Sequence, residues 1–199
     1  MYKWDEHYDT EEFVFGTEPN DFILEILHHL PKQGRALDLA TGEGRNGVFL
    51  AQHGLEVLGV DLSEVGLRKA QKLAESKGVR FATQQADLAE FDFPQEHYAV
   101  ITNIFCHFAE PKRSEVYRRV IDALEPGGLF AGVFYHPEQI MFGTGGPGDP
   151  AMLGTLRDMV DVFGGLEWIV AEHVRREVFE GSRHTGQSSL IRLLGRKPL

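Results

Sequence analysis

Short apolar runs alternate with helix-like stretches through the first two thirds of the chain, and this alternation limits the possible folds more than any other feature. Residues 35–40, 55–61, 79–87, 97–105 and 127–136 are each expected to form a buried strand. Helices are expected over 45–54, 63–78 and 111–128, with Ser63 as an N-cap and Gly54 as a terminating glycine. This pattern predicts an α/β fold with a parallel sheet and helices on both faces.

The two ends of the chain depart from the alternation. Residues 18–31 predict a helix that stops at Pro31, and the Gly- and Pro-rich stretch 137–150 predicts a loop or lid beside a ligand site. A helix over 151–165 and two strands, 166–180 and 187–198, bring the expected strand count to seven. We therefore expect one domain over 1–199, composed of a cap arm and helix (1–31), a ligand-binding core (35–136), a lid loop and helix (137–165) and a strand pair (166–199).

Composition narrows the classes of partner. The chain has 199 residues and a formal net charge of −10, whereas a protein that grips a nucleic-acid backbone usually needs a basic face. No apolar run approaches the roughly 20 residues of a membrane span, and the N-terminus lacks the order of a secretory signal. Cys106 is the single cysteine, which favours a reducing compartment. We expect a cytoplasmic protein with a small-molecule ligand, no nucleic-acid partner and no membrane; the oligomeric state is left open.

The loop GEGRNG at 42–47 follows the first apolar run and matches the G-x-G-x-x-G pattern of dinucleotide-binding loops. However, the carboxylate of Glu43 would repel a pyrophosphate at the helix N-terminus, and Asp38 adds a second acid four residues before Gly42. S-adenosylmethionine (SAM) carries a sulfonium and an ammonium but no phosphate, so this loop suits SAM better. The alternative for Glu43 is an acid that only complements the helix dipole.

Two further acids stand at strand ends. Asp61 can accept hydrogen bonds from ribose hydroxyls, which dinucleotides and SAM share; the alternative is an ordinary capping acid before Ser63. Asp87 can accept the adenine amino group while the backbone of Leu88 meets the ring; the alternative is a surface turn residue. A nicotinamide-dependent oxidoreductase usually needs a further substrate domain, so it remains the less favoured enzyme class.

The segments LDLATGEGRNG, VDLS, ADL and LEPGG, in this order within residues 20–136, resemble the class I SAM-dependent methyltransferases. Their usual acid and three alternating glycines correspond to Asp38, Ala40, Gly42 and Gly44, and alanine at the first glycine position is expected to cause only slight distortion. The resemblance implies a Rossmann-like seven-stranded mixed sheet of order 3-2-1-4-5-7-6, with strand 7 antiparallel. It also implies SAM as cofactor and S-adenosyl-L-homocysteine as product.

The same resemblance implies a set of cofactor contacts. Asp38 and the backbone of 40–44 would face the methionine part of SAM. The ribose and adenine contacts would come from Asp61, Leu62, Asp87 and Leu88, and the sulfonium side from Asn103 and Ile104.

A narrower resemblance lies outside this core. WDEHY, FVFGTEPNDF, the GRN after the second glycine and the RHT near the C-terminus are similar to the tellurite-resistance methyltransferase family, whose relatives include thiopurine and other chalcogen methyltransferases. This similarity implies an N-terminal segment folded over SAM, with Phe15, Gly16 and Glu18 in the cap and Arg45 at the SAM carboxylate. A His-Arg pair before the last strand is associated with the active site; here the order is reversed, Arg183-His184.

Histidines are the candidates for proton transfer. His107 and His136 follow the fourth and fifth expected strands, and with His184 and Arg183 they are the predicted catalytic residues; the alternatives are partly buried, backbone-bonded histidines and a solvated turn. No metal-ligand spacing is present, so no metal is expected. The predicted function is SAM-dependent methyl transfer to a small molecule, with thiol, selenium or tellurium species as candidates. A SAM-binding protein without catalysis remains the alternative.

Overall fold

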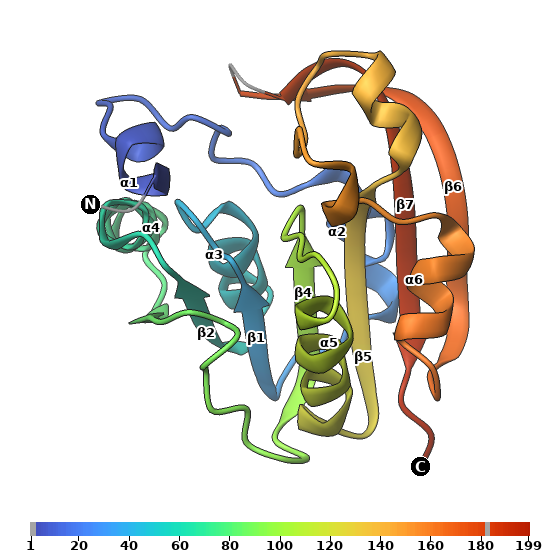
Figure 1. Cartoon of the computed structure of the whole chain (residues 1–199). Helices are drawn as coiled ribbons and strands as arrows, with labels where there is room; N and C mark the ends of the chain where they lie inside the picture. Colours follow the sequence, from blue (N-terminus) through green and yellow to red (C-terminus); the bar gives the residue numbers. More distant parts are fainter. Residues whose placement is uncertain (1–2, 182–183) are drawn as a thin grey trace.

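The chain folds around a seven-stranded sheet that runs through the centre of the molecule (Figure 1). The computed structural model describes residues 3–181 and 184–199. The strands are β1 (Arg35–Leu39), β2 (Glu56–Asp61), β3 (Ala82–Gln85), β4 (Tyr98–Ile104), β5 (Leu124–Tyr135), β6 (Glu167–Glu180) and β7 (His184–Arg196). Their order is β3-β2-β1-β4-β5-β7-β6; β1 to β5 pair in parallel, and β7 is antiparallel to both neighbours. This topology confirms the predicted sheet and its antiparallel seventh strand.

Helices cover both faces of the sheet. They are α1 (Lys3–Tyr8), α2 (Asp21–Glu25), α3 (Arg45–Gln52), α4 (Glu64–Lys77), α5 (Lys112–Ala123) and α6 (Leu156–Val162), with 3-10 turns η1 (Leu27–His29), η2 (Pro137–Met141) and η3 (Pro150–Met152). α5 and α6 lie in front of the sheet in Figure 1, and Val120 of α5 and Phe163, just after α6, belong to the same buried cluster as Ile101 of β4. β4 is buried along its whole length, as expected for a central parallel strand covered on both sides.

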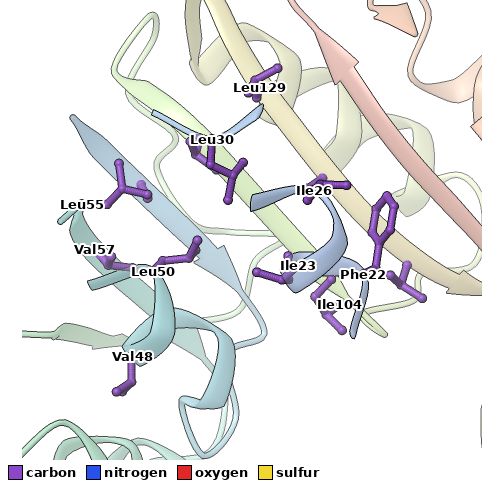
Figure 2. Close-up of a cluster of buried hydrophobic side chains, with 14 of the residues drawn as sticks. Phe22, Ile23, Ile26, Leu30, Val48, Leu50, Leu55, Val57, Ile104 and Leu129 are labelled. Atoms are coloured by element: carbon purple, nitrogen blue, oxygen red, sulfur yellow. The ribbon is translucent and has the colours of Figure 1, made fainter. Parts of the chain in front are cut away.

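The other face of the sheet is covered by α2, α3 and α4. Figure 2 shows part of this cluster, in which Phe22 and Ile23 of α2 and Leu50 of α3 lie near Val57 and Ile104 from the strands. Each such fully buried aliphatic or aromatic side chain contributes roughly 1.5–3 kcal/mol relative to an exposed one. The two clusters together fix the sheet and therefore the positions of the loops at its edges.

The N-terminal arm, residues 3–20, differs from expectation. It contains α1, which the sequence analysis did not anticipate, and then crosses the carboxyl edge of the sheet before α2 (Figure 1). The single helix expected over 18–31 is instead a short α2 capped by the Asn20 side chain, followed by η1, and the chain becomes extended at Leu30 before Pro31. None of the helices in the part of the chain that the structure describes is long and apolar enough to cross a membrane.

Candidate functional site

A cavity of about 730 Å³ lies at the carboxyl edge of the sheet, bounded on one side by the N-terminal arm. This volume is in the range of sites that enclose drug-sized ligands. Its walls come from the loops that follow β1 to β4, from Trp4, Tyr8 and Phe15 of the arm, and from Tyr135 and His184. Segments that are far apart in the sequence therefore form one enclosure.

The structure brings most of the predicted site residues to this cavity. Those that line it are Phe15, Gly16, Ala40, Gly42, Glu43, Arg45, Asp61, Leu62, Asp87, Leu88, Ile104, His107 and His184. Those that do not line it are Glu18, Asp38, Gly44, Asn103 and His136. Arg183 lies outside the described residues.

Several residues away from the cavity have contacts of another kind. Glu18 is exposed, and its Oε1 lies 3.6 Å from Nζ of Lys77. The Asn103 side chain donates to the Tyr117 hydroxyl at 3.1 Å, inside the protein. A Cβ on Gly44 would stand 2.6 Å from a side-chain carbon of α4, so this glycine permits the close packing of α3 on α4.

Asp38 is buried beneath the glycine loop and organises it. Its Oδ2 accepts the Thr41 hydroxyl at 2.5 Å, and its Oδ1 accepts the Thr102 hydroxyl at 2.7 Å. Burial raises the pKa of Asp38, while the two hydroxyls and the N–H of Gly47 favour the carboxylate. Asp38 therefore holds the turn and the start of α3 and does not face the cavity.

The backbone of the loop turns sharply at Ala40 and Gly42, which have φ values of 51° and 55°. A left-handed conformation costs an alanine roughly 1–2 kcal/mol, because its Cβ crowds the following carbonyl. At Gly42 an added Cβ would stand 2.6 Å from the Tyr8 hydroxyl, so glycine is also needed for the approach of the arm. Alanine at the first glycine position keeps the turn but at a cost in backbone energy.

Two carboxylates at strand ends offer hydrogen-bond acceptors to the cavity. Oδ2 of Asp61 accepts the N–H of Gly42 and Oδ1 accepts the N–H of Ser63, both at 2.8 Å. Burial raises the pKa of Asp61, and these backbone donors oppose the shift. Asp87 follows β3 in the same wall, where its Oδ1 also accepts a backbone N–H from Ala89 at 2.9 Å.

Glu43 fastens the arm to the glycine loop. Its Oε1 lies 2.5 Å from Nζ of Lys69 on α4, and both side chains are buried. Its Oε2 accepts the N–H of Val14 at 2.8 Å, and Lys69 donates to backbone carbonyls within residues 8–12. The acid inside the loop is therefore neutralised within the protein, so the electrostatic reason for excluding a pyrophosphate is weaker than the sequence implied.

Glu180, at the end of β6, is a buried acid that sequence reasoning missed. Its Oε2 lies 2.7 Å from Nη2 of Arg45, its Oε1 accepts the amide of Asn20, and Oε2 lies 3.7 Å from Nδ1 of His184. Burial acts to raise its pKa, but His184 and Arg45 together lower the pKa of Glu180 to about 2. The spacing of four residues between Glu180 and His184 across the hairpin is the sequence signal that points to this contact.

His184 belongs to a group of aromatic rings at the cavity wall. Its ring centroid lies 4.6 Å from that of Phe15, 4.9 Å from Phe105 and 5.9 Å from Tyr135. Its Nδ1 is buried and has no hydrogen-bond partner among the described residues. The rings come from the arm, the end of β4, β5 and β7, and they form an apolar wall beside the strand-end acids.

His107 also lines the cavity, but both of its nitrogens are engaged by backbone groups. Its Nε2 accepts the N–H of Tyr135 at 3.0 Å, so Nδ1 carries the proton and donates to the carbonyl of Phe105 at 2.9 Å. Burial lowers the pKa of His107 to about 4, which keeps the ring neutral near pH 7. This geometry corresponds to the backbone-bonded alternative.

His136 lies outside the cavity, beside β6. Its ring stacks on His173 with centroids 3.9 Å apart, and Glu138 is close to both rings. Within residues 3–181 and 184–199, these three form the one group whose ligand atoms are close enough for a metal ion. Two nitrogens of Arg175 already bind the Glu138 carboxylate, each at 2.8 Å.

The lid segment, residues 137–153, is anchored at both ends. Near its start, Oε1 of Gln139 accepts the N–H of Ser189 on β7 at 2.8 Å. Near its end, Arg113 of α5 donates to the carbonyl of Ala151 at 2.7 Å. The stretch between these anchors lines the cavity.

Residues 36–128 match the protein family described as a methyltransferase domain. The matched segment runs from β1 into β5. The chain is similar to the putative methyltransferase YqeM of Bacillus subtilis, with 36% identity over 104 residues that cover 50% of this chain and 42% of the relative. It is also similar to the tRNA 5-carboxymethoxyuridine methyltransferase of Escherichia coli K12, with 28% identity over 116 residues that cover 56% and 44%. The chain thus spans less than half the length of either relative.

The fold of the chain also matches solved structures of methyltransferases. An N-methyltransferase of Haemonchus contortus in complex with S-adenosylhomocysteine matches 98% of this chain and 58% of its own, with a TM-score of 0.72 and 19% identity. The chain therefore has the Rossmann-like fold of these methyltransferases.

The lining of the cavity fits SAM by its chemistry. The ribose hydroxyls and the adenine amino group are donors, and the carboxylates of Asp61 and Asp87 are acceptors in the wall. A carboxylate such as that of SAM pairs well with a guanidinium, and Arg45 lines the same cavity.

Proposed function

We propose that the protein transfers a methyl group from SAM to a small-molecule acceptor. The observation that carries this proposal is the single cavity in which Asp61, Asp87 and Arg45 share an enclosure with the rings around His184. The acids and Arg45 suit the polar ends of SAM, and the rings suit an acceptor beside them.

SAM, when bound, supplies the methyl group; its S–CH₃ bond breaks with the electron pair left on sulfur, giving S-adenosyl-L-homocysteine. In our proposal Asp61 accepts the ribose hydroxyls, Asp87 and Leu88 hold the adenine, and Arg45 binds the carboxylate. Phe15 and Gly16 of the arm cover the bound ligand. The protein accelerates the reaction chiefly by orienting the acceptor and excluding water.

We propose a thiol or another chalcogen species as the acceptor, as in the tellurite-resistance type of methyltransferase. The arm supports this subfamily, because it contributes Trp4, Tyr8 and Phe15 to the cavity wall and the resemblance implied such a cap. The wall of Phe15, Phe105 and Tyr135 also suits a soft, weakly hydrated nucleophile. His184 is our candidate for a base, whereas His107 is assigned a supporting role because both of its nitrogens are engaged.

A nucleic-acid acceptor is the second candidate, since one relative acts on tRNA. Against it stands the formal net charge of −10. In addition, Arg45 is the one Arg or Lys among the cavity-lining residues that the structure describes. Binding to a phosphate backbone requires several such cations. A small molecule is therefore the better proposal.

A ligand screen followed by an acceptor screen tests the proposal. Thermal shifts with SAM, S-adenosylhomocysteine, NADH and FAD should be positive for the first two only. Mass spectrometry of thiol, selenite, tellurite and unmodified tRNA mixtures should then detect a methylated small molecule. Stabilisation by a dinucleotide alone would overturn the cofactor assignment. SAM binding without methylation of any acceptor would favour a SAM-binding protein without catalysis.

A further inference from the structure

Glu180 joins three parts of the candidate site. Its carboxylate contacts Arg45 at the start of α3, Asn20 at the end of the arm and His184 at the start of β7. The side chain is only 9% exposed. Because an acid at this depth needs charged or hydrogen-bonding partners, the positions of Arg45, Asn20 and His184 all depend on this one carboxylate.

The contact with His184 has a chemical consequence. Nδ1 of His184 is buried, and the Glu180 carboxylate oxygen at 3.7 Å is its charged neighbour. A shortening of about 0.5–1 Å would bring the two atoms into hydrogen-bonding range. An acid in that position holds the proton on Nδ1 and leaves the lone pair of the ring on Nε2, as the acid does in an acid-histidine pair of hydrolytic enzymes.

We propose that Glu180 is a positioning residue that keeps the His184 proton on Nδ1, so that Nε2 can take a proton from the methyl acceptor. The same carboxylate aligns Arg45 with the carboxylate of the cofactor. This inference rests on the proposed function and narrows its substrate class to acceptors that reach the site with a proton to lose, such as thiols. The acceptor's lone pair forms the new bond to the methyl carbon as the S–CH₃ bond breaks with its electron pair left on the cofactor's sulfur; the acceptor's proton passes to Nε2, and water then removes that proton.

Other groups near the ring do not supply this interaction. Arg45 is a cation already paired with Glu180, and His107 is neutral with both nitrogens engaged. The Tyr135 ring meets His184 at 5.9 Å between centroids, and burial together with Glu180 raises the pKa of its hydroxyl. Within the described residues, Glu180 is the carboxylate that lies within ion-pair distance of Nδ1 of His184.

Nitrogen-15 NMR of the histidine rings tests the inference without turnover. The protein, labelled at histidine and saturated with S-adenosylhomocysteine, should place the His184 proton on Nδ1, with the signal assigned by its loss in His184→Asn. Free neutral histidine prefers the proton on Nε2, so the Nδ1–H form is diagnostic. In Glu180→Gln the proton should move to Nε2. A wild-type ring with its proton on Nε2 would overturn the inference, even if no variant at Glu180 folds.

Kinetics of a double-mutant cycle provide the second readout. Glu180→Gln should lower kcat by roughly 30-fold and raise the Kd for SAM by about threefold to tenfold. In the His184→Asn background the same change should leave kcat nearly unaltered, because the group it positions is gone. Glu25→Gln is the matched control. Glu25 lies on α2, away from the cavity, and forms an ion pair with Arg192 of β7, so both constants should stay unchanged.

The outcomes separate this inference from the proposed function. If the wild type methylates a thiol and Glu180→Gln leaves kcat unchanged, only the role of Glu180 is overturned. The same holds if Glu180→Gln lowers kcat equally in the wild-type and His184→Asn backgrounds. Failure of the wild type to bind SAM overturns the proposed function. If SAM binds but no acceptor reacts, the NMR result alone decides whether Glu180 sets the protonation of His184.

Discussion

Nζ of Lys69 lies 2.5 Å from Oε1 of Glu43, so the acid between the two glycines of the loop is paired with a cation from the neighbouring helix. The same lysine binds carbonyls of the arm, and Glu43 binds the N–H of Val14. The sequence suggests that the Glu43 carboxylate faces the ligand. In the structure this carboxylate instead attaches the N-terminal arm to the glycine loop.

Breaking this pair is expected to destabilise the protein strongly. Lys69→Met should lower the free energy of unfolding by roughly 3–5 kcal/mol, because it leaves the Glu43 carboxylate buried without a counter-charge. Urea unfolding measures the change. Arg68→Met, one residue earlier on α4 in an exposed pair with Glu64, should cost less than about 1 kcal/mol. Adding Glu43→Gln to Lys69→Met should recover part of the loss; no recovery would contradict the ion-pair explanation.

The role of Asp61 in cofactor binding can be measured directly. Asp61→Asn should weaken SAM binding by roughly 1.5–3 kcal/mol, which is about 10- to 150-fold in Kd, because the ribose loses a charged acceptor. Titration calorimetry gives the Kd, and Asp122→Asn, in an exposed pair on α5, is the control. An unchanged affinity in Asp61→Asn would remove Asp61 from the cofactor site.

His184 is expected to act on turnover more than on cofactor binding. His184→Asn should lower kcat by roughly 100-fold, the size of a typical general-base contribution, with little change in the Kd for SAM. His28→Asn, at an exposed position in η1, is the matched control. Full activity of His184→Asn with every acceptor would exclude the histidine from the reaction.

The left-handed backbone at Ala40 predicts a stabilising substitution. Ala40→Gly should raise the free energy of unfolding by about 0.5–1 kcal/mol, since relief of the strained φ outweighs the added freedom of the unfolded chain. Ala51→Gly within α3 should have the opposite effect, a loss of about 1 kcal/mol. Thermal and urea unfolding of the two variants provide the comparison, and destabilisation by Ala40→Gly would mean that the turn is not strained.

Acidification is expected to destabilise the fold through His107. Burial lowers its pKa from 6.5 to about 4, so between these values the unfolded chain binds a proton that the folded protein does not. Stability contributed by this group is therefore lost as the pH falls from about 6.5 to 4, with a slope of at most about 1.4 kcal/mol per pH unit. His107→Gln should show a shallower decline in urea unfolding at pH 7, 6 and 5. Parallel declines would show that another group is responsible.

The fold could be predicted from the sequence because its signals are local. Apolar runs and their glycine-rich turns mark β1, β2, β4 and β5, and the family resemblance supplies the strand order. The expected helix over 18–31 was wrong in length, because Asn20 starts a helix that the extended chain before Pro31 soon ends. Helix α1 is short and is held in place by tertiary contacts such as that of the Asp5 carboxylate with the Ser63 hydroxyl, at 2.6 Å.

The candidate site shows the same contrast between residues that local sequence signals reveal and residues that only distant contacts explain. Asp61 and Asp87 were found because an acid at the end of a parallel strand is visible in the sequence itself. Lys69 and Glu180 were missed because their partners are distant: Arg45 and Glu180 are separated by 135 positions. Asp38 and Gly44 were expected at the ligand, yet they support the loop from behind, and no local pattern distinguishes those two positions.

The lid segment is tied to α5 through Arg113 and to β7 through Gln139, while the arm depends mainly on Lys69, Glu43 and Asp5. Opening of the cavity on the arm side would require residues 3–12 to leave α4. Such an opening would break the buried pair of Lys69 with Glu43, which lie 2.5 Å apart. Substitutions at Lys69 or Glu43 are therefore expected to change access to the cavity more than substitutions at Gln139 or Arg113.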